Sequence, residues 1–147
     1  MTAKTNYLEN KLIDWFFRGQ AFTPPATIYI GLMTTVTDGE AGTITEVSGG
    51  SYARVAVTSS LANWAGTQGA GTTVASTGTG GATSNNNAVT FPAPTADWGQ
   101  ATHFGLFDAA SGGNMLAQAA LTTPKTINNG DPAPSFAAGA LTYQEDN

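Results

Sequence analysis

The sequence of 147 residues contains no cysteine, a single histidine and few charged side chains. The absence of cysteine excludes disulfide bonds, thiolate nucleophiles and cysteine-ligated metal ions within the chain. Charged residues make up 10% of the sequence, whereas about 25% is typical of globular domains. The net charge is −5 and the five basic residues are scattered. Because binding to phosphates needs clustered Lys and Arg, we expect no nucleic-acid partner.

Long hydrophobic runs are also missing. No apolar run approaches the ~20 residues that a membrane-spanning helix needs, and residues 1–11 lack the apolar segment of a signal peptide. We therefore expect no membrane partner, and a protein that is made in the cytoplasm and stays soluble or joins an assembly. The length predicts a single domain over residues 1–147, since domains usually hold roughly 100–200 residues.

The chain begins with a pattern typical of an amphipathic helix over residues 6–18. Asn6 and Glu9 fit a capping box, and Gly19 is suited to end the helix. An apolar stripe at helical spacing, widened by two further side chains, predicts a face that needs a cover: either the chain's own sheet, which is the simpler interpretation, or a partner chain. The stripe consists of Leu8, Leu12, Trp15 and Phe16, and the wider set adds Ile13 and Phe17.

Most of the remaining chain has the pattern of short strands separated by turns. Residues 27–35 are apolar on both faces, which predicts a central strand, and residues 36–50 form a predicted glycine-rich loop. The segment 91–121 predicts a large hairpin that reverses at Ser111–Asn114. Further strands are predicted at 52–59, 88–91 and 136–143, with a turn at 128–131. This arrangement favours a mainly β fold: an antiparallel β-sandwich of jelly-roll type with one N-terminal α-helix.

Residues 65–87 are uncharged and rich in Gly, Thr and Ala. Such a composition offers little apolar surface to offset the entropy of ordering, so we expect a loop over 60–87 that is mobile in isolation. Its lack of charge leaves open that it becomes ordered against another protein, with Trp64 as an anchor. Trp98, which precedes Gly99 at the start of the hairpin, is predicted to be a buried structural residue.

Candidate catalytic and ligand-binding chemistry is sparse. His103 could act as a general base with Asp97 or Asp108, but its place in an apolar strand favours a structural role. Asn128, Asn129 and Asp131 could offer oxygen ligands to a cation, although turn formation explains them more simply. The aromatic residues Tyr29, Trp64 and Trp98 could form a sugar-stacking platform, for which core packing is the simpler explanation. We therefore expect no enzymatic activity, no cofactor and no metal.

Several segments resemble a family of small proteins encoded among the structural genes of tailed bacteriophages. The combination of Ala-Asp-Trp-Gly with His-Phe-Gly-Leu-Phe-Asp within 91–116 is the most specific of these similarities. The other similar segments are 6–32, 46–57 and 121–142, so the resemblance covers most of the chain outside the low-complexity loop. It implies a virion component with a jelly-roll-like β-sandwich and no enzymatic activity, made in the host cytoplasm.

Members of that family are labelled as tail-fibre proteins or resemble head decoration (cement) proteins that trimerise on the capsid. The expectation from the sequence is accordingly a capsid decoration protein on the head surface, bound to the major capsid protein and to copies of itself, as a trimer. A tail or tail-fibre component and a glycan-binding virion module are the alternatives. The predicted partner contacts are Leu8, Leu12, Trp15, Phe16 and Trp64, together with the 60–87 loop.

Overall fold

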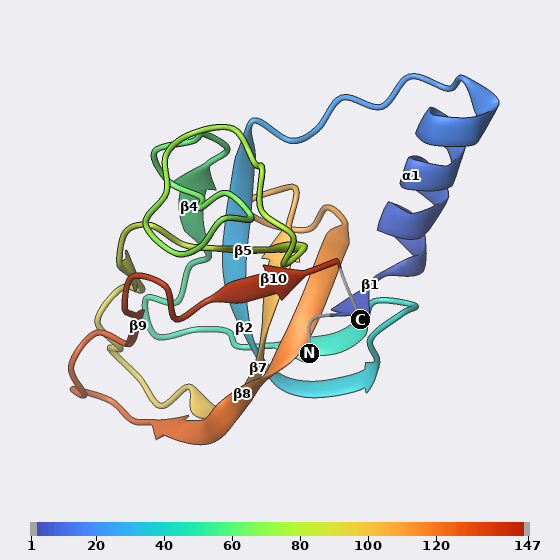
Figure 1. The fold of residues 1–147 in the computed structure, drawn as a ribbon. Helices are drawn as coiled ribbons and strands as arrows, with labels where there is room; N and C mark the ends of the chain where they lie inside the picture. Colours follow the sequence, from blue (N-terminus) through green and yellow to red (C-terminus); the bar gives the residue numbers. More distant parts are fainter. Residues whose placement is uncertain (1–2, 146–147) are drawn as a thin grey trace.

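The computed structural model describes residues 3–145. It contains one helix, α1 (Asn6–Arg18), and short and long β-strands (Figure 1). The strands are β1 (Ala3–Lys4), β2 (Thr27–Asp38), β3 (Thr43–Glu46), β4 (Val55–Thr58), β5 (Ala82–Ser84), β6 (Val89–Thr90), β7 (Gly99–Phe107), β8 (Met115–Ile127), β9 (Ser135–Phe136) and β10 (Thr142–Gln144). The prediction of a mainly β chain with one N-terminal helix is confirmed.

Six strands form the main sheet, in the order β1-β8-β7-β2-β3, and β4 also pairs with β2. Two further sheets have two strands each, β5 with β10 and β6 with β9, and every pairing is antiparallel. In Figure 1, β10 crosses in front of the long strands of the main sheet. Leu141, just before β10, packs in the same buried cluster as Ile30 of β2 and Leu106 of β7. The antiparallel fold class is confirmed, whereas the jelly-roll form of a sandwich stays a prediction.

Strand β2 is central, as its apolar faces predicted. One edge pairs with β7 along Tyr29–Met33, and the other edge is shared between β4 at Thr27–Ile30 and β3 at Met33–Asp38. The prediction of a loop over 36–50 is wrong at residues 36–38, which continue β2, and at residues 43–46, which form β3. A tight turn makes this pairing possible, since the Asp38 carboxylate accepts the backbone N–H of Ala41 at 3.0 Å.

Helix α1 is capped by Thr5, so the predicted capping box on Asn6 is wrong. The Thr5 hydroxyl accepts the backbone N–H of Leu8 and donates to the carbonyl oxygen of Met115 in β8 at 2.6 Å. Thr5 is buried, so one side chain both starts the helix and attaches it to the main sheet. At the other end Gly19 adopts a left-handed conformation with φ of 67°, as the sequence predicted.

The low-complexity segment follows a defined path, although its composition predicts mobility. Asn85 is buried, and its side-chain amide donates to the carbonyl oxygens of Asn87 and Ala137 and accepts the N–H of Leu141. Strand β5 in this segment pairs with β10. Side-chain hydrogen bonds to backbone groups thus supply attachments that a count of apolar residues does not capture.

Trp98 is a core residue, in agreement with the sequence prediction. Its side chain is 4% exposed, and its indole N–H donates to the carbonyl oxygen of Gly50 at 2.9 Å. The ring lies edge-on to Tyr52, with 5.2 Å between ring centroids. The indole therefore connects the start of β7 to the segment between β3 and β4.

Replacement of Trp98 by Ala should lower the free energy of unfolding by about 3–5 kcal/mol, because it empties a large buried site. Urea denaturation followed by circular dichroism measures this change. Trp98→Phe keeps a ring in the cavity and should retain more of the stability. A change for Trp98→Ala within about 0.5 kcal/mol, as at exposed positions, would contradict the structural role.

The change Asn85→Ala should lower the free energy of unfolding by about 1–3 kcal/mol, because it leaves the buried N–H of Leu141 without this partner and removes two part-buried bonds to carbonyl groups. Asn87→Ala is the matched control, because the Asn87 side chain bonds at an exposed site. Limited proteolysis within residues 65–81 should become faster in the Asn85 variant alone. Equal stability and equal cleavage in both variants would show that Asn85 does not hold the segment.

Candidate protein-contact surface

An apolar groove of about 290 Å³ lies between helix α1 and the body of the domain. Helix α1 stands beside the sheet and contacts it through β8, near the helix N-terminus (Figure 1). Leu8 and Leu12 form the helix side of the groove, and Trp64 lies on the opposite side. The remaining apolar lining is Ile28, Leu106, Leu116, Ala117 and Tyr143. Three of the five predicted contact residues are therefore brought together in one place.

An ion pair lies at one end of this groove. The Lys4 ammonium contacts the Glu145 carboxylate at 2.5 Å, and the Tyr143 hydroxyl donates to the same carboxylate. Burial opposes ionisation of Glu145, but the hydrogen bonds from Lys4 and Tyr143 outweigh it and lower the pKa of the carboxyl group. Burial, with the adjacent carboxylate, raises the pKa of Tyr143. The lowered pKa favours the ionised Glu145 carboxylate at neutral pH, where it contacts Lys4.

The second half of α1 carries a cluster of exposed large apolar side chains, including Phe16 and Phe17, the two most exposed of their kind in the described chain. Trp15 is 52% exposed, Phe16 73% and Phe17 76%, and Ile13 is exposed by half. The three aromatic rings touch one another, with centroid separations of 5.9 Å between Trp15 and Phe16 and 5.2 Å between Phe16 and Phe17. We call Ile13, Trp15, Phe16 and Phe17 the aromatic helix end.

The predicted contact residues thus fall into two groups. Leu8, Leu12 and Trp64 are half-buried in the groove, whereas Trp15 and Phe16 project from the aromatic helix end. The simpler interpretation, that the chain's own sheet covers the apolar stripe, is correct only for the first turns of α1. Phe17 is missing from the predicted contact residues, although it belongs to the wider apolar set on the helix, and this helical spacing could have identified it. It is the most exposed of the large apolar side chains.

The sugar-stacking platform, considered as an alternative to core packing, is not formed. Trp98 is buried in the main core, and Tyr29 packs against a separate cluster around Met33 and Phe107. Trp64 is half-buried, and its indole N–H is buried without a hydrogen-bond partner among the described residues. Three aromatic faces that point into different parts of the fold cannot stack on one sugar.

The residues considered for catalysis have structural partners. His103 contacts the Thr102 hydroxyl through Nδ1 at 2.8 Å. Asp97 accepts the backbone N–H of Asn129, and Asp108 accepts both the backbone and the side-chain amide of Asn114. Asp131 closes the turn that begins at Asn128. Within residues 3–145, no three or more His, Asp or Glu side chains cluster as a metal site would require.

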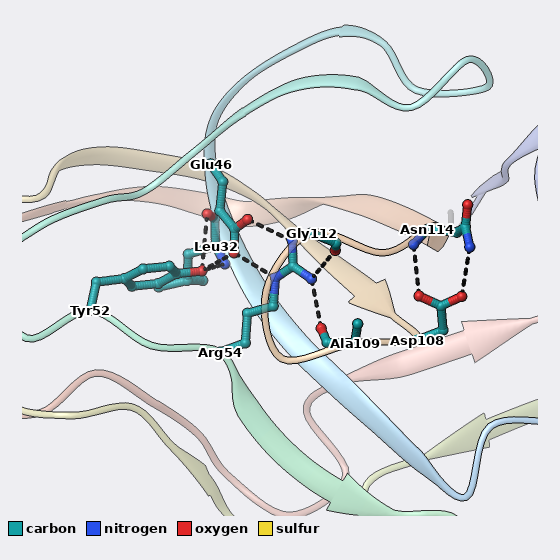
Figure 2. Close-up of polar contacts among 8 residues, drawn as sticks. All are labelled: Leu32, Glu46, Tyr52, Arg54, Asp108, Ala109, Gly112 and Asn114. Atoms are coloured by element: carbon teal, nitrogen blue, oxygen red, sulfur yellow. Dashed lines mark hydrogen bonds and ion pairs between the residues drawn. The ribbon is translucent and has the colours of Figure 1, made fainter.

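Figure 2 shows a polar network around Arg54 that the sequence did not single out. The guanidinium group donates to both carboxylate oxygens of Glu46, at 2.8 and 2.7 Å. It also donates to the carbonyl oxygens of Ala109 and Gly112, at 2.7 and 2.9 Å. The Arg54 side chain is 6% exposed and the Glu46 side chain 23% exposed. Such a charge-assisted, bidentate pair is among the stronger polar contacts in a protein.

Tyr52 extends this network to the backbone of β2. Its hydroxyl donates to Glu46 at 2.8 Å and accepts the N–H of Leu32 at 2.8 Å. Leu32 lies between the stretches of β2 that pair with β4 and β3. Burial raises the pKa of Tyr52, and the neighbouring Glu46 carboxylate acts in the same direction. The hydroxyl therefore stays protonated, and it accepts the Leu32 N–H at the point of β2 where neither β3 nor β4 pairs with it.

The guanidinium group of Arg54 also stacks on an aromatic ring. Its guanidinium carbon lies 3.5 Å from the centroid of the Phe107 ring. That ring covers Gly31 and Gly105, which face each other across β2 and β7. A Cβ atom would come within 2.9 Å of the ring at Gly31 and within 2.8 Å at Gly105. Two glycines are therefore needed for Phe107 and Arg54 to stack on the sheet.

The Arg54 network is a structural element, because its hydrogen-bonding groups are occupied by other protein groups. It joins β3, the segment before β4 and the loop between β7 and β8, as Figure 2 shows. The groove and the aromatic helix end offer apolar contact on the described surface. No helix within residues 3–145 has the length and apolar character needed to cross a membrane.

The change Arg54→Met should lower the free energy of unfolding by about 3 kcal/mol, because Glu46 would be left as an unpaired, mostly buried charge. Arg54→Lys should also be destabilising, since an ammonium group cannot form the same bidentate contact. The double variant Arg54→Met/Glu46→Gln should lose less stability than the sum of the losses in the single variants Arg54→Met and Glu46→Gln. Denaturant unfolding of the unchanged protein, these two single variants and the double variant measures this coupling. If the losses in free energy of unfolding of the two single variants simply add up in the double variant, Arg54 and Glu46 do not stabilise the fold as a pair.

Comparison with known proteins supports the resemblance drawn from the sequence. No curated protein matches the chain. The family model described as podophage GP4 fiber I protein gp80 matches residues 3–144, which include the helix and every strand from β1 to β10. The chain belongs to this family, and it is therefore a structural protein of a tailed-phage virion.

Proposed function

We propose that this protein is an accessory component of the phage tail that acts through protein contacts and without catalysis. The observation that carries the proposal is the aromatic helix end, where three contacting aromatic side chains stay at least half exposed. Large exposed apolar clusters on soluble proteins mark interaction sites. The family's description as a fiber protein favours a position on the tail.

The surroundings of the aromatic helix end suit a stable protein contact. Arg18 pairs with Asp14 at 2.8 Å, so two of the nearest charges compensate each other. Burial of a whole Phe side chain contributes about 1.5–3 kcal/mol to association. Two exposed phenylalanines with Trp15 therefore contribute favourably to association, and this contribution offsets part of its entropic cost.

Capsid decoration, with the major capsid protein as partner and a trimer of this chain as the attached unit, is the second candidate. Lys4 and Glu145 lie close to the two ends of the described chain and form an ion pair. The two ends of the described chain therefore lie side by side, an arrangement that suits attachment to a shell as well as to a tail. Both candidates place the same exposed surface against another virion protein.

The position of the protein on intact virions tests the proposal. Gold-labelled antibody in the electron microscope, with quantitative gel densitometry, should show a small number of copies confined to the tail. Label spread over the whole head in high copy number would contradict the tail position and support decoration. Absence from purified virions would contradict both candidates.

A matched pair of variants tests the contact surface. Phe16→Gln/Phe17→Gln should lower incorporation into virions at least about tenfold, since a loss of about 1.4 kcal/mol already has that effect. Leu61→Gln/Val74→Gln is the control, because these apolar side chains are 55% and 61% exposed elsewhere. Both proteins should unfold at nearly the same temperature as the unchanged protein. Normal incorporation of the Phe16/Phe17 variant would overturn the role of this surface.

A further inference from the structure

We draw no further inference here: the strongest candidate, the apolar groove of about 290 Å³ between helix α1 and Trp64, carries none because nothing among the described residues 3–145 shows what covers it.

Discussion

The fold depends on how one edge of β2 is completed. Two short strands, β3 and β4, share that edge, and neither reaches the backbone N–H of Leu32. The Tyr52 hydroxyl accepts this N–H, while Glu46 and Arg54 fix the position of the hydroxyl. An unfilled buried N–H would cost about 1–3 kcal/mol, so three polar side chains are retained in an otherwise apolar environment. Through Arg54 the same network also holds the loop between β7 and β8.

This arrangement explains how a chain with few charged residues can hold distant segments of its fold together. Arg54, which forms the most buried ion pair of the described residues with Glu46, also donates to the carbonyl oxygens of Ala109 and Gly112, which lie far from it in the sequence. Lys4 with Glu145 likewise joins the two ends of the described chain, at the helix groove. Elsewhere, uncharged side chains such as Thr5 and Asn85 attach segments by hydrogen bonds to the backbone. The surface can therefore stay poor in charge.

Local patterns predicted those parts of the fold that local energetics determine. The bounds of α1, the central position of β2 and the turns at Ser111–Asn114 and Asn128–Asp131 follow from helical spacing, apolar faces and turn residues. Long-range polar partners could not be predicted in this way. Asn85 reads as part of a low-complexity run, yet its partners are Ala137 and Leu141. In the sequence Arg54 is one of five scattered basic residues, whereas in the fold its partners come from β3 and from the loop between β7 and β8.

The candidate site shows the same division between local and long-range determinants. Helical spacing identified the apolar stripe on α1, but which of its members are covered depends on where Thr5 attaches the helix to β8. Attachment at the N-terminal end places Leu8 and Leu12 against Trp64 and leaves the last turns beyond the sheet. A helix lying along the sheet would have buried its aromatic residues in the domain itself. The single buried hydroxyl of Thr5 therefore decides that these residues remain available to another chain.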